Sequence, residues 1–394
     1  MENPITGRVA KFTAETDWKK LPAQIHKTAK SLIFDHLCVT LAGSRSQAGR
    51  IIQQYAKELG GSKEAPILGT TERAPVPIAS LANGVAAHAD DYDDTQIASL
   101  PDRVTGLLTH PTTPVLSAAL ATACALGKTG KELLVAYEVG LEVACKMAEA
   151  IHPAHYQRGF HSTGTLGAFG AFAAVAKLLH MTEPEIIRGL GIVASLASGI
   201  RGNFGTMTKP LHAGRAAENG VVAARLARKR FTATPDILDS RWGFFSILGG
   251  GFDEEYLMER LGSPFQLEWP GVSIKAYPCG ILAQPTMDAV RSSRVQTFLP
   301  RVNCCIDPQI EALGFDKIRS KIRVLLKDGR SFVKEASLAR GFPEQPFSLQ
   351  DHLAKFEECA EGVLPPGLGK NIWESVMRLE ELPKANEIIQ HLIP

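Results

Sequence analysis

The sequence predicts a mainly α-helical protein with a large all-helical domain and a smaller α+β domain. Apolar residues recur with helical spacing through the first two thirds of the 394-residue chain, as in amphipathic or buried helices. Near Gly271 proline and cysteine become frequent and a hairpin pattern follows, before helical spacing returns from Leu349 onward. We therefore divide the chain into a helical domain of residues 1–268, an α+β domain of residues 269–345, and C-terminal helices of residues 346–394 that pack back on the helical domain.

Periodicity and capping residues define the helices of the first domain. Thr113 and Pro114 give one helix a cap residue and a proline in its first turn, and Gly127 ends it. Residues 164–179 and 184–200 are almost wholly Ala, Gly and aliphatic, so we expect both helices to be buried on most sides. The predicted helices cover residues 25–43, 113–127, 131–151, 164–179, 184–200 and 218–228, and residues 231–235 lead into one more.

The smaller domain contains a predicted β-hairpin. β-Branched residues alternate along residues 317–339, and Asp328-Gly329 interrupts them, which is a strong signal for a hairpin turn. Residues 341–348, GFPEQPFS, form a rigid turn that carries no chemistry of its own.

Composition argues against several classes of function. A formal net charge of +2 gives no basis for binding nucleic acid or an anionic membrane. The seven cysteines are scattered without a CxxC pair, which is typical of reduced thiols. The N-terminal residues contain no signal-peptide core, and no apolar run is long enough to cross a bilayer. We expect a cytoplasmic protein that acts on a small molecule.

The most informative segment crowds four aspartates into residues 90–94 and supplies His110 at the start of a helix. Neighbouring carboxylates repel one another, so such a group indicates cations, a metal or chemistry. Apolar helical stretches flank the group, which favours a pocket over the alternative of a solvated acidic loop. The same residues satisfy DDxxD, the pattern with which helical isoprenoid synthases bind magnesium and diphosphate, but we find no second metal-binding motif.

Two later segments place cationic or titratable side chains in apolar surroundings. His161 opens a buried helix, where free backbone N–H groups favour an anion such as a carboxylate; the alternative is a hydrogen-bonded core histidine. Lys209, His212 and Arg215 lie within seven residues, next to glycines that let backbone approach a ligand; the alternative is a basic turn at the surface.

A last segment, KAYPC, places Lys275 and Tyr277 on a proline-fixed turn at the predicted domain junction, where clefts commonly bind ligands. The whole set combines cations, histidines and an acidic loop, without a nucleophile elbow, a P-loop or a GxGxxG fingerprint. It suits proton transfer next to a carboxylate, in which Lys and His stabilise developing negative charge while an acid or base moves the proton. Such a reaction on a small carboxylic acid needs no cofactor.

Six motifs follow one another along nearly the whole chain: HADDYDDT, THPTTPVL, GFHSTGTLGAFGA, GTMTKPLHAGRAAENGVVAA, KAYPC and GFPEQPFS. They resemble the MmgE/PrpD family, which includes 2-methylcitrate dehydratase, cis-aconitate decarboxylase and iminodisuccinate epimerase. The resemblance implies a large all-helical domain, a smaller lid-like α+β domain and a homodimer. It also implies that active-site groups of the decarboxylase branch fall at Asp91, Thr95, His110, His161, Lys209 and Lys275.

We therefore expect a cofactor-independent lyase of a small di- or tricarboxylic acid, similar to cis-aconitate decarboxylase or 2-methylcitrate dehydratase. The alternatives are an epimerase or isomerase of a small dicarboxylate, a non-catalytic family variant, and a magnesium-dependent isoprenoid-type enzyme. The expected catalytic residues are His110, His161, Lys209 and Asp91, the expected substrate-binding residues are Thr95, His212, Lys275 and Tyr277, and no metal ligand is expected.

The chain departs from the family pattern in two places. Residues 300–316 are short and lack the tyrosine of an aromatic-rich family motif, which implies a trimmed lid. Gly280 and Gln284 follow KAYPC at positions where histidines are common in the family. These departures imply either changed chemistry or a variant with reduced activity.

Overall fold

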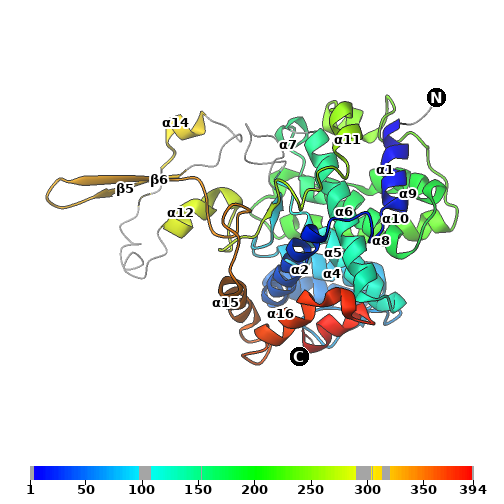
Figure 1. Cartoon of the computed structure of the whole chain (residues 1–394), viewed down its shortest axis with the longest axis horizontal. Coiled ribbons are helices and arrows are strands. Elements are labelled where there is room, and N and C mark those ends of the chain that lie inside the picture. Colours follow the sequence, from blue (N-terminus) through cyan, green and yellow to red (C-terminus); the bar gives the residue numbers. More distant parts are fainter. Residues whose placement is uncertain are drawn as a thin grey trace.

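The computed structural model describes residues 4–96, 108–151, 153–289, 303, 305–312 and 320–392. Its helices and strands are α1 (Pro4–Glu15), α2 (Ala23–Ser44), α3 (Gln47–Leu59), β1 (Ala65–Pro66), β2 (Arg73–Ala74), α4 (Val76–His88), β3 (Thr95–Gln96), α5 (Thr112–Leu126), α6 (Gly130–Ala150), α7 (Ala154–Gln157), α8 (Ser162–Leu178), α9 (Glu183–Leu196), η1 (Arg201–Asn203), α10 (Thr208–Arg228), η2 (Phe245–Gly249), α11 (Glu254–Arg260), β4 (Val272–Ser273), η3 (Ile281–Ala283), α12 (Gln284–Ala289), α14 (Pro308–Glu311), β5 (Ser320–Leu325), β6 (Ser331–Ala336), α15 (Leu349–Ala360), α16 (Gly369–Met377), η5 (Leu379–Glu381) and η6 (Ala385–Leu392). Helices dominate and the sheets are small, which confirms the mainly α-helical class (Figure 1).

The helical body is built around α8, which packs closely against α6 and α10. A Cβ on Gly170 of α8 would lie 2.7 Å from the Cβ of Ala144 on α6. A Cβ on Gly220 of α10 would likewise lie 2.5 Å from the backbone nitrogen of Phe172 on α8. Glycine thus permits helix backbones to approach at distances that a larger residue would prevent. Every α8 residue except Lys177 is buried, as predicted.

The prediction that residues 184–200 form a helix buried on most sides holds only in part. Helix α9 ends at Leu196, and burial on all sides is confined to residues 189–193. Glu183, Glu185 and Arg188 keep the other side of its first turns partly exposed. Partial exposure keeps the carboxylates of Glu183 and Glu185 hydrated, whereas full burial would require a partner for each of them.

Helix α10 begins at Thr208, well before the predicted start at residue 218, so Lys209 and His212 lie on a helix rather than in a loop. Pro210 is tolerated because the N–H groups of a first helical turn have no intrahelical partner. A Cβ on Gly214 would lie 2.5 Å from a backbone oxygen of α4. This glycine therefore brings two helices together rather than admitting a ligand to the backbone.

Two smaller predictions also differ from the structure. Thr113 does not cap α5: that helix begins at Thr112, and the Thr113 hydroxyl donates a hydrogen bond of 2.6 Å to Asp93 Oδ2. The helix expected after residues 231–235 does not form in the described chain before η2; residues 232–243 make loops and turns. In the first case a tertiary hydrogen bond takes the hydroxyl expected to cap the helix, and in the second the tertiary fold overrides a local helix signal.

The C-terminal helices pack on α2. The Phe34 ring centroid lies 5.6 Å from that of Phe356 on α15 and 5.0 Å from that of Trp373 on α16. This contact agrees with the expected return of the chain to the helical body, although the boundaries of the three parts stay a prediction. Among the described helices, none combines the length and the apolar character needed to cross a membrane.

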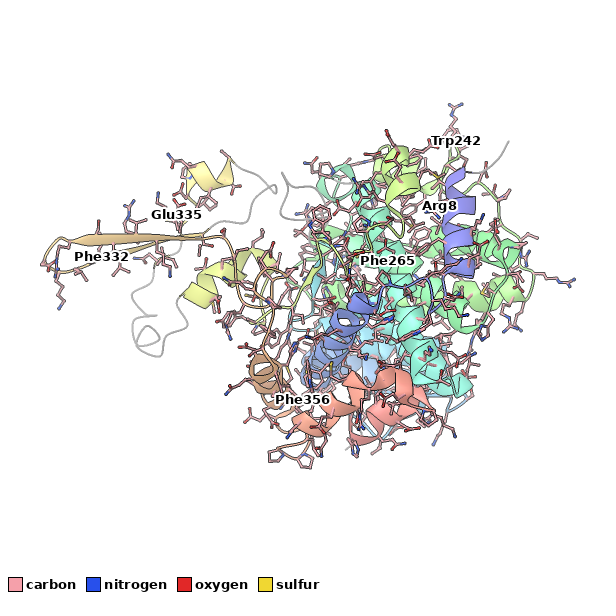
Figure 2. All side chains as sticks on the ribbon, viewed as in Figure 1. Arg8, Trp242, Phe265, Phe332, Glu335 and Phe356 are labelled. Carbon is pink, nitrogen blue, oxygen red and sulfur yellow. The ribbon has the colours of Figure 1, made fainter. Side chains whose placement is uncertain are left out.

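The β5–β6 hairpin projects from the helical body (Figure 1), and Phe332 and Glu335 stand on its second strand (Figure 2). The strands are antiparallel, with Phe332 opposite Val324 and Glu335 opposite Lys321. Gly329 adopts a φ of 85° in the connecting turn, which confirms the hairpin predicted from its sequence. The trimmed-lid prediction rests on residues 300–316, of which residues 300–302, 304 and 313–316 lie outside the described residues.

Candidate active site

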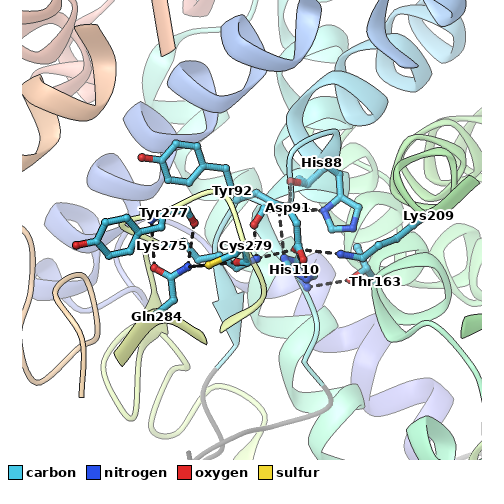
Figure 3. A network of polar contacts seen from close by, with 12 residues as sticks. His88, Asp91, Tyr92, His110, Thr163, Lys209, Lys275, Tyr277, Cys279 and Gln284 are labelled. Atoms are coloured by element: carbon cyan, nitrogen blue, oxygen red, sulfur yellow. Dashed lines mark hydrogen bonds and ion pairs between the residues drawn. The ribbon is translucent and has the colours of Figure 1, made fainter. Parts of the chain in front are cut away.

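The acidic segment follows α4 and turns sharply at Asp91, whose φ of 51° is uncommon for a residue other than glycine. Lys209 Nζ and Lys275 Nζ lie 2.9 and 2.7 Å from Asp91 Oδ1, and Lys275 also donates 2.7 Å to the Asp91 carbonyl oxygen (Figure 3). Burial raises the pKa of Asp91, but Lys275, His110 and Lys209 outweigh it and hold the pKa well below its usual range. The turn is therefore fixed by two cations on one carboxylate oxygen.

A second, fully buried carboxylate, Asp93, holds the histidines of the site. His88 Nδ1 lies 2.9 Å from both Asp93 oxygens, and His110 Nδ1 lies 3.2 Å from Oδ1. Burial raises the pKa of Asp93, but His110 and His88 outweigh it and keep the pKa well below its usual range. Asp93 thus remains a charged anchor for both imidazole rings.

His110 stands between the two carboxylates. Its Nε2 lies 3.6 Å from Asp91 Oδ1, on the side opposite its contact with Asp93, and its backbone N–H donates 3.0 Å to the Thr163 hydroxyl. With a carboxylate near each ring nitrogen, His110 can carry a proton on either one. This placement suits proton transfer at the site.

His161 and His212 form a pair beside this cluster. His161 is the N-cap residue of α8, its side chain is buried, and its Nδ1 lies 3.1 Å from His212 Nδ1. Its Nε2 has no hydrogen-bond partner among the described residues. Burial lowers the pKa of His161 well below its usual value, and His88 and His110 lower it further. Burial therefore favours the neutral form of His161, and its Nε2 is a buried nitrogen whose hydrogen-bonding capacity is unused among the described residues.

The other two aspartates of the segment face elsewhere. Asp90 is exposed at one side and borders a cavity of about 330 Å³ together with Arg45, and burial raises its pKa. Asp94 is buried against the backbone N–H and hydroxyl of Thr112, and burial raises its pKa well above the usual range. The carboxylates of the DDxxD pattern do not share one environment, which argues against the magnesium–diphosphate alternative.

Four residues of the cluster could hold a metal ion by ligand type and spacing. His88, Asp91, Asp93 and His110 offer ligand atoms that all lie within 4.8 Å of one another. Nitrogen and carboxylate ligands of this kind suit zinc and related ions. However, the two ammonium groups already neutralise Asp91, so a metal would have to displace them from that carboxylate.

The strand pair β3–β4 joins the two halves of the site. Thr95 lies in β3 opposite Ser273 of β4, two residues before Lys275, so the pairing brings Lys275 back beside the acidic segment. Thr95 stands four positions after Asp91, a spacing that would place both on one face of a helix, but the chain is extended here and they do not share a face. The Thr95 hydroxyl is buried and has no hydrogen-bond partner among the described residues.

Two predicted cationic or polar groups lie apart from the Asp91 cluster. The Tyr277 hydroxyl donates 3.0 Å to Asp288 and accepts from Arg340, and Figure 3 shows it pointing away from Asp91. Arg215 is exposed and pairs with Glu218 instead of joining Lys209 and His212. A substrate role for Tyr277 stays a prediction.

Gln284 supports the KAYPC turn from within. Its Oε1 accepts from the backbone N–H groups of Ala276 and Tyr277, at 2.9 and 3.2 Å, and its amide nitrogen donates to the Tyr277 carbonyl. A Cβ on Gly280 would lie 4.0 Å from Asp91 Oδ2 with no other close neighbour. Glutamine at one position thus holds the backbone, and glycine at the other leaves space beside Asp91.

Sequence reasoning missed two residues of this site, His88 and Lys355. His88 reads as the last residue of an apolar helix, although its position just before the aspartates is a signal that could have been used. Lys355 Nζ donates to the carbonyl oxygens of Tyr92 and Lys275, at 3.0 and 2.9 Å, and pairs with Asp35 Oδ1 at 2.7 Å. Lys355 therefore holds the backbone on both sides of the Asp91 cluster.

Comparisons with known proteins agree with this architecture. The family model for the MmgE/PrpD N-terminal domain matches residues 7–257, and that for the MmgE/PrpD C-terminal domain matches residues 279–381. Cis-aconitate decarboxylase from Homo sapiens is 30% identical over 284 residues, which cover 70% of this chain and 56% of the human protein. The Mus musculus enzyme of the same name is 30% identical over 286 residues, again 70% and 56%.

A more distant relative, cis-aconitate decarboxylase from Aspergillus terreus, is 24% identical over 313 residues, or 76% of this chain and 62% of that protein. The chain thus spans less than two thirds of the length of these relatives. The N-terminal family model nevertheless covers more than half of the chain, and both models match in order. The chain therefore belongs to the MmgE/PrpD family.

Proposed function

We propose that the chain is a lyase that decarboxylates cis-aconitate or a similar di- or tricarboxylic acid without a cofactor, with dehydration of a 2-methylcitrate-like acid as the nearest variant. The observation that carries this proposal is the convergence of Lys209 and Lys275 on Asp91 Oδ1, at 2.9 and 2.7 Å. Two ammonium groups that share a carboxylate oxygen form a site that a substrate carboxylate can enter in competition with Asp91. The relatives named cis-aconitate decarboxylase support the reaction class.

The histidines match the proton transfers that such reactions require. When the bond to a carboxylate breaks, CO₂ leaves and the electron pair stays on carbon, where neighbouring cations stabilise it. His110 or His161, the latter through Nε2, would then give that carbon a proton, and the neutral His161 would be the base in a dehydration or an epimerisation. An epimerase of a small dicarboxylate therefore remains the alternative. The family resemblance also supports a homodimer, and the scattered cysteines support a cytoplasmic location.

The experiment that tests the reaction class is an NMR screen of the purified chain in D₂O with cis-aconitate, citrate, 2-methylcitrate and iminodisuccinate. Loss of CO₂, loss of water and solvent exchange at carbon each leave a different spectrum, so one assay separates decarboxylase, dehydratase and epimerase. We expect decarboxylation. Turnover of none of the four acids would favour the non-catalytic family variant.

Chelation and Asp91→Asn together test whether the acidic cluster uses a metal. We expect turnover to survive EDTA, and Asp91→Asn to abolish most of it without changing the metal content, because the amide cannot hold both lysines by charge. Activity lost in EDTA and restored by a divalent ion would instead make His88, Asp91, Asp93 and His110 a metal centre.

Lys209→Ala tests the carboxylate site directly. We expect KM to rise by roughly 10- to 100-fold, the worth of one charge-assisted hydrogen bond, with little change in melting temperature. Lys229→Ala is the matched control, because this exposed lysine follows the other end of α10. Unchanged kinetics in Lys209→Ala would remove this lysine from the substrate site.

A further inference from the structure

His212 reaches the site from the same helix face as Lys209. The two residues are three positions apart in the first turns of α10, a spacing that places side chains side by side. Lys209 points to Asp91, whereas His212 points to His161 at the N-terminus of α8. His212 is only partly buried, so its ring extends from the buried histidine towards solvent.

Among the described residues, His212 offers the one hydrogen-bonded path by which a proton can reach or leave His161 Nδ1. Its side chain is buried, its ring is stacked 5.6 Å from that of His88, and the edge contact with Phe204 is 4.9 Å. The titratable and charged groups around the pair are Lys209 on α10, His88 at the end of α4 and His110 just before α5. Among the described residues, His212 is the one that faces His161 Nδ1 at hydrogen-bond distance.

Two facing Nδ1 atoms can share one proton. If His161 carries it, His161 Nδ1 donates, His212 Nδ1 accepts, and His161 Nε2 has a lone pair; if His212 carries it, the roles reverse. The 3.1 Å separation suits an N–H···N hydrogen bond in either case. A proton gained at one end of the pair can therefore be passed on at the other.

We propose that His212 is a proton-relay residue that connects His161 to solvent, rather than a ligand of the substrate; this inference rests on the proposed function. When His161 Nε2 takes a proton from carbon, its Nδ1 proton passes to His212 Nδ1, and His212 Nε2 releases one to water. Each ring gains a proton at one nitrogen and loses one from the other nitrogen, so both imidazoles end neutral. Run backwards, the same path delivers a proton to the site.

The kinetic test compares His212→Ala and His212→Asn with the wild-type chain. The substrate is the acid that the NMR screen identifies. Without the relay, kcat should fall at least about tenfold while KM stays within about twofold, and added imidazole should restore the rate of His212→Ala. His180→Asn is the control, since this histidine is exposed and follows the C-terminal end of α8, whereas His161 caps its N-terminus. A raised KM with unchanged kcat, or a lower kcat that imidazole does not restore, would overturn the relay.

A second measurement does not depend on turnover. In the full chain labelled with ¹⁵N-histidine, the shared proton should produce a scalar coupling between the Nδ1 nuclei of His161 and His212, and His212→Asn should remove it. A wild-type spectrum without this coupling overturns the relay, whatever the substrate. A coupling that is present in a chain inactive on every acid would show that the proposed reaction fails while the hydrogen-bonded pair exists.

Discussion

His110→Gln is expected to lower kcat by a factor of about 10² to 10⁴, the usual contribution of a positioned acid or base. Glutamine can still hydrogen-bond to Asp93 and the backbone N–H can still donate to Thr163, so the local fold should persist. It cannot, however, take up and release a proton. Steady-state kinetics and a melting curve on the same preparation measure both effects.

The matched control is His155→Gln. Both nitrogens of His155 are hydrogen-bonded, to the Leu248 carbonyl oxygen at 2.9 Å and to the Thr165 hydroxyl at 2.7 Å, and burial lowers its pKa to about 4. We expect His155→Gln to have a lower melting temperature and an unchanged kcat. If His110→Gln behaved in the same way, His110 would be a core histidine like His155. The same comparison applies to His161→Gln.

The site residues that could be predicted from the sequence are those that interrupt otherwise apolar helical segments. Asp91, His110 and Lys209 each lie in such an interruption, and the structure brings them together with Lys275. Their partnership depends on the β3–β4 pairing, which joins segments about 180 positions apart. Two-residue strands have too little periodicity to be predicted, so the pairing of Thr95 with Ser273 had no signal in the sequence.

Local sequence patterns could not predict the roles of residues whose polar groups are buried in the folded protein. Lys355 lies on an amphipathic helix, where a lysine is expected to face water. The packing of Phe356 on Phe34 turns that helix so that Lys355 points inward to Asp35. The role of Gln284 could not be predicted either, because the backbone groups that hydrogen-bond to its amide come together only in the folded KAYPC turn.

Lys355→Met is expected to lower the free energy of unfolding by about 3–5 kcal/mol, because it leaves Asp35 charged and buried without its partner. Burial raises the pKa of Asp35, and Lys355 opposes that rise. In the variant the folded state should therefore bind a proton more tightly than the unfolded state, so the loss of stability should grow as the pH rises from about 4 towards 7. Urea denaturation at several pH values measures this.

Two comparisons separate the buried ion pair from a general effect of removing a lysine. Lys370→Met removes an exposed lysine that lies 4.0 Å from Glu374, so its cost should stay below about 1 kcal/mol. Adding Asp35→Asn to Lys355→Met should recover part of the loss, because the uncompensated charge disappears. If Lys355→Met lowered the free energy of unfolding no more than Lys370→Met does, and equally at every pH, a stabilising ion pair between Lys355 and Asp35 would be contradicted. Lys355 also binds the carbonyl oxygens of Tyr92 and Lys275, so Lys355→Met should lower turnover as well, and the double variant should regain part of the stability but none of the turnover.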